Sequence, residues 1–213
     1  MLRFEKGPIP RGLKALQGQK DGWRDSRRFW DPILRDQHYL CAYCQRRIEP
    51  QNERMHVEHW APQNPANQAG DGSQNLRWSN LLGVCAGTSG KERHCDTAKG
   101  NQTLYLHPVE GQGPSPREHL RYWVDGTVAS DGRRSSEVQK DIEILGLNAR
   151  ILKRGREELL GFIQQRLGKG QWTVAALERE YKKWMLDSAP RAPEFVEVAG
   201  FFFRRWIRAA ARR

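Results

Sequence analysis

The chain contains 213 residues, of which 36 are Lys or Arg and 25 are Asp or Glu, so its formal net charge is +11. Eight Trp, seven Phe and five Tyr exclude a wholly disordered chain, because so many large apolar side chains are poorly hydrated. No apolar stretch approaches the ~20 residues that span a bilayer, and no secretory signal is recognisable. The sequence predicts a globular cytoplasmic protein whose charge favours a polyanion, either a nucleic acid or an acidic membrane surface.

The positive charge lies on both flanks of a nearly neutral centre. Residues 1–40 have nine basic and five acidic side chains, and residues 141–213 have fifteen and nine. Residues 41–100 have seven and six, and residues 101–140 have five of each. We therefore expect a central site between two basic segments that hold a substrate or a partner.

The fold class expected is α+β, with three segments in chain order. Residues 1–37 are predicted to be a basic arm and a helix, which starts with Asp31 as cap and Pro32 at the first helical position. Residues 38–105 hold the unusual side chains and are predicted to be the functional core. Within them, residues 61–75 are polar and turn-rich, as in loops that are functional or mobile.

Residues 106–213 are predicted to form a β-hairpin and then a mainly helical part. The strand formers of residues 120–124 precede Asp125-Gly126, which favours a two-residue hairpin turn. Helical spacing follows in four stretches. The predicted caps and ends are Ser136 for the first helix, Asn148 and Gly168 for the second, and Thr173 for the third, and the last helix contains Phe201 to Trp206.

Four cysteines lie within 55 residues, which is typical of a metal site in a cytosolic chain. Cys41 and Cys44 are separated by two residues, a spacing that presents two thiolates to one ion, and Cys85 and Cys95 can complete a tetrahedral set. We predict one structural Zn²⁺ site, with His94 as the alternative to Cys85. A closed four-sulfur site has no open position for a substrate, so any catalysis must come from other residues.

A second group of metal-binding and proton-transferring side chains lies between the cysteine pairs. His56, Glu58 and His59 lie within four residues, and in an extended strand His56 and Glu58 share one face while His59 points to the other. A bend at the strand end would let Glu58 bind a divalent ion while His59 acts on a water beside it. His56 is expected to be structural or to support the ligands.

These residues resemble the HNH endonuclease family, whose ββα-metal site is a strand ending in an acid and a His, a second strand carrying Asn, and a helix with a further ligand. Glu58-His59 is similar to the first element, Asn80 to the second, and Cys95-Asp96 with Lys99 to the third. The longer resemblance is to retron-associated and Septu-system HNH nucleases, the PtuB-like proteins. It implies a cytoplasmic DNA endonuclease of anti-phage defence, with an ATPase partner and no membrane.

By this resemblance, each matched residue has an expected role. His59 is the general base, Glu58 and Asp96 hold a catalytic Mg²⁺ or Mn²⁺, Asn80 orients the His59 loop, and Lys99 contacts phosphate. Asp96 stands where the common pattern has His, and Glu58 where it more often has Asp. Nine residues separate Cys85 from Cys95, more than the usual spacing. His94 competes with Asp96 for the ligand role.

Two alternative functions remain open at this stage. The chain is either the endonuclease, or a catalytically inactive, zinc-stabilised module that binds nucleic acid, or a regulatory subunit that docks the ATPase. The net charge supports any polyanion-binding function, whereas cleavage depends on His59 and the divalent-ion ligands.

Overall fold

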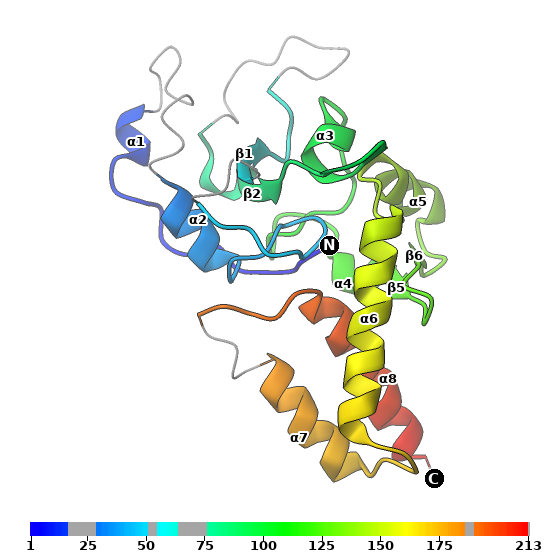
Figure 1. Ribbon diagram of the computed structural model, residues 1–213. Helices are drawn as coiled ribbons and strands as arrows, with labels where there is room; N and C mark the ends of the chain where they lie inside the picture. Colours follow the sequence, from blue (N-terminus) through cyan, green and yellow to red (C-terminus); the bar gives the residue numbers. More distant parts are fainter. Residues whose placement is uncertain (17–28, 51–54, 64–75, 186–189, 213) are drawn as a thin grey trace.

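The computed structural model describes residues 1–16, 29–50, 55–63, 76–185 and 190–212. Trp23 and most of the polar stretch 61–75 lie outside these ranges. The described part of the chain contains short strand pairs and helices in separate runs, with four consecutive helices at its end, which confirms the α+β prediction (Figure 1). The elements are α1 (Leu13–Leu16), α2 (Trp30–Asp36), β1 (Met55–His59), the 3-10 helix η2 (Trp78–Asn80), β2 (Leu81–Cys85), β3 (Thr88–Ser89), β4 (Glu92–Arg93), α3 (Cys95–Lys99), α4 (Pro116–His119), β5 (Leu120–Tyr122), β6 (Val128–Ser130), α5 (Ser135–Ile144), α6 (Arg150–Leu167), α7 (Val174–Met185) and α8 (Val196–Ala210).

The described strands form three separate antiparallel pairs: β1 with β2, β3 with β4, and β5 with β6. In the first pair Met55 lies opposite Cys85 and His59 opposite Leu81. Gly83, in the middle of β2, lies against Ile33 of α2, where an added Cβ would be 3.0 Å from that side chain. The small residue therefore lets α2 pack closely on the strand pair that carries the candidate site.

The first residues pack into the core, whereas the sequence predicted a basic arm. Leu2 and Phe4 are buried, Phe4 forms a parallel bridge with Val109, and the Leu2 amide donates to the Ala42 carbonyl. One hydrophobic cluster contains side chains from Met1 to Phe202, and so from all three predicted segments. The burial of apolar surface ties these segments together.

The β5–β6 hairpin is present, but its turn is longer than predicted. Trp123 donates its amide to the Thr127 carbonyl, so the loop has three residues, Val124, Asp125 and Gly126, and not two. Gly126 has a φ of +75° and approaches the backbone of Lys153, where a Cβ would be 2.0 Å from the carbonyl oxygen. Glycine at the left-handed position of a three-residue hairpin loop explains the observed geometry.

Three predicted helix caps differ from the structure. α2 begins at Trp30, so Asp31 lies in its first turn and is not the cap. α5 begins at Ser135 after Arg134, and the Ser136 hydroxyl donates to Glu137. α6 follows Ala149, and the Asn148 side chain instead pairs with the backbone of Val128, accepting from its amide and donating to its carbonyl. For α6 a long-range contact of the fold therefore takes the side chain that was predicted to be the cap.

The last three helices form a lobe beside the strand-bearing part (Figure 1). α6 ends at Gly168, as predicted, and Thr173 caps α7 by accepting from the Ala176 amide. Phe202 and Phe203 are buried, which confirms that the aromatic residues of α8 pack this lobe. Within the described residues, every helix is too short or too polar to cross a membrane.

Candidate active site and metal centre

The strand pair β1–β2 and the helix α3 bring together residues that are 40 positions apart. His56 and Glu58 alternate with Val57 on β1 and both reach α3, as expected for positions i and i+2 of a strand. Asp96 and Lys99, at positions i and i+3, lie on one face of α3. The two faces form two cross-contacts: His56 with Asp96, and Glu58 with Lys99.

The Glu58–Lys99 contact is the buried one. Lys99 Nζ donates to Glu58 Oε1 at 2.5 Å and to the His59 carbonyl at 3.0 Å, and the lysine side chain is 0% exposed. This differs from the prediction that Lys99 reaches a phosphate, because its ammonium group faces Glu58 and not the solvent. Burial, together with the nearby Asp96 charge, raises the pKa of Glu58 to about 7 against the opposing effect of Lys99.

The second contact is more exposed. His56 Nδ1 hydrogen-bonds Asp96 Oδ2, and the two side chains are 46% and 26% exposed. Because Asp96 influences the pKa of Glu58 through both charge and hydrogen bonding, the two carboxylates lie close together. Carboxylate oxygens are ligands that Mg²⁺ and Mn²⁺ favour, so the chemistry of this pair fits the divalent ion expected there.

His59 ends β1 and is nearly buried, with Nε2 3.4 Å from Nε2 of Gln63. Asn80 holds the chain just beyond it. The Asn80 side chain accepts from the Ala61 amide at 2.7 Å and donates to the Ala61 carbonyl at 3.2 Å. The backbone carbonyl of Asn80 accepts from the Trp60 amide. These bonds tie Asn80 to Trp60 and Ala61, the two residues after His59, and its orienting role stays a prediction. The catalytic role of His59 stays a prediction.

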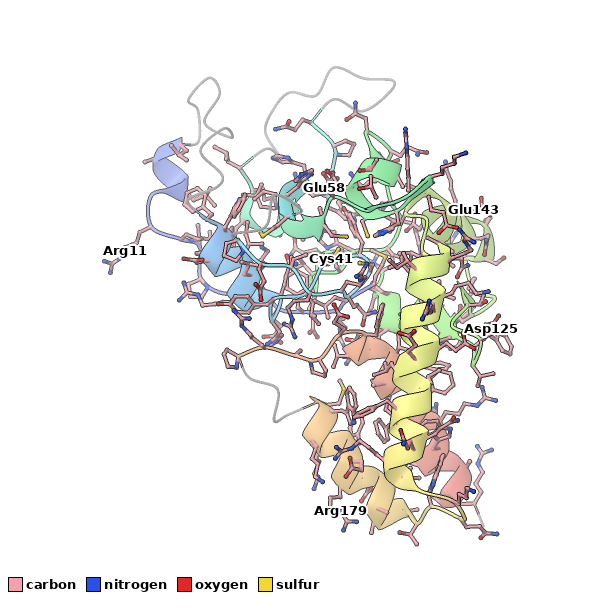
Figure 2. All side chains as sticks on the ribbon, viewed as in Figure 1. Arg11, Cys41, Glu58, Asp125, Glu143 and Arg179 are labelled. Carbon is pink, nitrogen blue, oxygen red and sulfur yellow. The ribbon has the colours of Figure 1, made fainter. Side chains whose placement is uncertain are left out.

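The four cysteine sulfurs lie within 4.8 Å of one another and form a group that can hold a metal ion. Cys41 Sγ is 3.8 Å from Cys95 Sγ, and Cys44 Sγ is 3.7 Å from Cys85 Sγ. A tetrahedron with metal–sulfur bonds of ~2.3 Å has edges of about 3.8 Å, so the spacing fits a tetrahedral ion. Figure 2 shows Cys41 below Glu58 of β1.

The long spacing between Cys85 and Cys95 is explained by the β3–β4 hairpin. Gly87, at a φ of +75°, accepts from the His94 amide at 2.7 Å, and a Cβ there would lie 1.7 Å from the His94 carbonyl oxygen. The nine intervening residues therefore turn back on themselves and bring Cys95 close to Cys85. His94 Nδ1 lies 3.2 Å from Cys95 Sγ and 3.9 Å from Cys85 Sγ, so it faces the sulfur group and not Asp96.

Among curated proteins, one from Escherichia coli named "Retron Ec83 putative HNH endonuclease" is 28% identical to this chain over 162 residues. The similarity supports the HNH endonuclease family. The matched region covers 60% of this chain and 62% of that relative, so it leaves more than a third of each sequence unmatched. No family model matches the chain.

The structure also brings in a residue that the sequence did not single out. Tyr43 lies between Cys41 and Cys44 and is fully buried, and its hydroxyl has no hydrogen-bond partner among the described residues. Burial raises its pKa well above the ordinary value, and the charges of Glu58, Cys41, Cys95 and Asp96 act in the same direction. The charges that act on Tyr43 thus come from both sites. Its place within the Cys41–Cys44 turn was the one signal available in the sequence.

Proposed function

We propose that the chain is a metal-dependent HNH endonuclease that hydrolyses DNA phosphodiester bonds. The observation that carries the proposal is the convergence of Glu58, His59, Asn80, Asp96 and Lys99 on one strand–strand–helix unit. These residues come from three segments, and each matches an element of the resemblance in the order of the chain. The similarity to the retron-associated relative supports the same function.

The four-cysteine group is proposed to hold a structural Zn²⁺. Four thiolates at tetrahedral spacing are the usual ligands of structural zinc, and Cys41 and Cys95 are fully buried. The ion would join the segment after α2 to both ends of the β3–β4 hairpin. It would therefore fix α3, and with it Asp96 and Lys99, relative to β1.

His59 is proposed to take a proton from the water whose oxygen attacks the scissile phosphorus. An imidazole has an ordinary pKa of ~6.5, so it can accept a proton near neutral pH. Asn80 fixes the backbone beyond His59 and so limits the positions that its ring can adopt. Bound between Glu58 and Asp96, Mg²⁺ or Mn²⁺ would supply positive charge to the phosphate and to the leaving 3′ oxygen.

The basic flanks are proposed to hold DNA or a protein partner. Residues 141–213 contain fifteen basic side chains, and α6 presents Arg150 and Arg154 on an exposed face. Both arginines form exposed ion pairs, which contribute little to stability and can exchange for phosphate contacts. We propose a cytoplasmic defence complex of the retron or Septu type, with an ATPase as the partner. This part of the proposal comes from the resemblance and from the name of the relative.

A plasmid-cleavage assay tests the proposed function. Purified wild-type protein, alone and with its co-purified partner, is incubated with supercoiled DNA and Mg²⁺, Mn²⁺ or no divalent ion. We expect nicking or linearisation that depends on the ion and disappears in His59→Ala, while zinc content and DNA binding persist. His38→Asn is the matched control, because His38 is an exposed histidine whose positive φ of 50° asparagine tolerates.

Two outcomes of this assay favour the other functions. If wild-type protein and His59→Ala bind DNA equally and neither cuts it with the partner present, the chain is a binding module. If an Asp96→Ala, His59→Ala double variant retains defence activity in cells, the chain acts as a regulatory subunit. Either result contradicts the endonuclease proposal.

A further inference from the structure

His56 occupies a position that the proposed reaction does not yet use. Its side chain is 46% exposed, and it lies two residues before Glu58 on the same face of β1. Its contact on α3 is Asp96, one of the two proposed ligands of the divalent ion. Asp96 lies in the first turn of α3, three residues before Lys99.

The acid and the nitrogen-bearing side chain follow one another in opposite order on β1 and on α3. On the strand the nitrogen-bearing side chain, His56, precedes the acid, Glu58. On the helix the acid, Asp96, precedes the nitrogen-bearing side chain, Lys99. Each carboxylate therefore faces one donor across the gap, and the two carboxylates are diagonal neighbours.

Each donor occupies one oxygen of its carboxylate. Lys99 Nζ donates to Oε1 of Glu58, and His56 Nδ1 contacts Oδ2 of Asp96. With Asp96 ionised, its carboxylate can only accept, and His56 Nδ1 is then the donor of the second contact. The other carboxyl oxygens are Oε2 of Glu58 and Oδ1 of Asp96, and the two carboxyl groups also interact with each other.

We propose that His56 is a positioning residue for the divalent-ion site, which holds Asp96 Oδ2 and leaves Oδ1 for the ion. The inference rests on the proposed function, because only that function makes Asp96 a ligand of a divalent ion. Carboxylates that bind metals are commonly held by a hydrogen bond from a neighbouring side chain, and loss of that bond typically weakens metal affinity 10- to 100-fold. Lys99 supports Glu58 in the same way.

Metal binding by the full, zinc-loaded chain tests this inference without measuring cleavage. Mn²⁺ affinity is determined by titration calorimetry for wild type, His56→Ala, His56→Asn and His56→Gln. Asparagine places an amide N–H near the position of Nδ1, whereas glutamine places it near Nε2. We expect His56→Ala to bind Mn²⁺ 10- to 100-fold more weakly, His56→Asn to recover most of the affinity, and His56→Gln to recover less.

Pulsed electron paramagnetic resonance of bound Mn²⁺ separates a positioning residue from a direct ligand. An imidazole nitrogen that binds Mn²⁺ directly gives a ¹⁴N coupling. We expect the spectra of wild type and His56→Asn to show the same nitrogen coupling, if any, because His56 does not touch the ion. A ¹⁴N coupling that is lost in His56→Ala and His56→Asn overturns the inference and makes His56 a ligand.

The affinities also separate failure of this inference from failure of the proposed function. If wild type and His56→Ala bind Mn²⁺ equally while Asp96→Ala does not bind it, the positioning role is wrong and the proposed ion site stands. If wild type binds no Mn²⁺ at all, both the proposed ion site and the positioning role of His56 are wrong. Zinc content and melting temperature are measured for every variant, so that a folding defect is recognised.

Discussion

The ammonium nitrogen of Lys99 lies 2.5 Å from Oε1 of Glu58, where the lysine side chain is 0% exposed and the glutamate side chain 14%. Removing one partner of a buried ion pair leaves an uncompensated charge and typically costs ~3–5 kcal/mol. We therefore predict that Lys99→Met lowers the free energy of unfolding by about 3 kcal/mol, measured by urea denaturation at pH 8. Protonation of Glu58 limits the loss, because its pKa is already raised to about 7.

A double variant and a surface pair control this prediction. Lys99→Met combined with Glu58→Gln should recover much of the loss, because the remaining amide carries no charge. Lys153→Met breaks the exposed pair with Asp125, at 3.3 Å, and should cost less than about 1 kcal/mol. Equal effects of Lys99→Met and Lys153→Met would show that the Lys99 pair is not buried in solution.

The contrast between Lys99 and the cysteines shows what the sequence could predict. The two-residue spacing of Cys41 and Cys44 is a local signal, and the four sulfurs meet as expected. The family resemblance gave Lys99 a phosphate contact, and nothing local reveals that Glu58, 41 positions earlier, faces it. Asn148 likewise looked like a cap, yet its partner is Val128, 20 positions away. Local patterns were enough to predict secondary-structure elements and the cysteine group. They could not predict the partners of Lys99 and Asn148, because those partners lie far away in the sequence.

His107 provides a pH dependence that is separate from both metal sites. Burial lowers its pKa from 6.5 to about 4, and its Nδ1 accepts a hydrogen bond from the Val109 amide at 3.0 Å. The unfolded chain therefore binds a proton between pH 6.5 and 4 that the folded chain does not. We predict that the contribution of His107 to the free energy of unfolding is fully present above pH 6.5. The free energy of unfolding should fall by about 3 kcal/mol as the pH falls to 4.

Comparison with His107→Asn isolates that contribution from the other groups that titrate in acid. Asparagine offers an oxygen to the Val109 amide and does not titrate in this range. The difference in unfolding free energy between wild type and variant, measured by urea denaturation at several pH values, should change by about 3 kcal/mol between pH 6.5 and 4. A difference that is constant with pH would mean that His107 is protonated equally in both states.

Asn80 is predicted to affect both stability and cleavage. Its side chain makes two hydrogen bonds to the backbone of Ala61 and is 3% exposed. Asn80→Ala leaves the part-buried amide and carbonyl of Ala61 without these partners, at a cost of about 1–3 kcal/mol. We expect a lower melting temperature and a loss of cleavage at a temperature where the variant is still folded, because the chain beyond His59 is no longer held.

Asn80→Asp distinguishes the two hydrogen bonds. A carboxylate still accepts from the Ala61 amide, but it cannot donate to the Ala61 carbonyl and its second oxygen would repel that carbonyl. Asn80→Asp should therefore be at least as unstable as Asn80→Ala and remain impaired in cleavage. The measurements are thermal unfolding and the rate of plasmid nicking under the same ionic conditions. Wild-type cleavage by Asn80→Ala would show that the position of His59 does not depend on Asn80.

Removal of the structural metal should unfold the core, whereas removal of the catalytic ion should not. Cys41 and Cys95 are fully buried and their sulfurs are 3.8 Å apart, so the fold holds the ligands at a spacing that a bound ion stabilises. Structural zinc contributes its binding free energy to folding. We therefore predict about one Zn²⁺ per chain by atomic absorption, and loss of the cooperative thermal transition after treatment with a strong chelator under reducing conditions.

Dialysis that removes only Mg²⁺ or Mn²⁺ is the matched comparison. Glu58 and Asp96 already have Lys99 and His56 as partners, so their carboxylates do not depend on a divalent ion for compensation. The melting temperature should change little, while cleavage stops. Cys44→Ser should reproduce the chelator result, because serine is a poor zinc ligand and Cys44 is 2% exposed. A reduced, metal-free chain with the wild-type melting temperature would contradict the proposed structural role of the four cysteines.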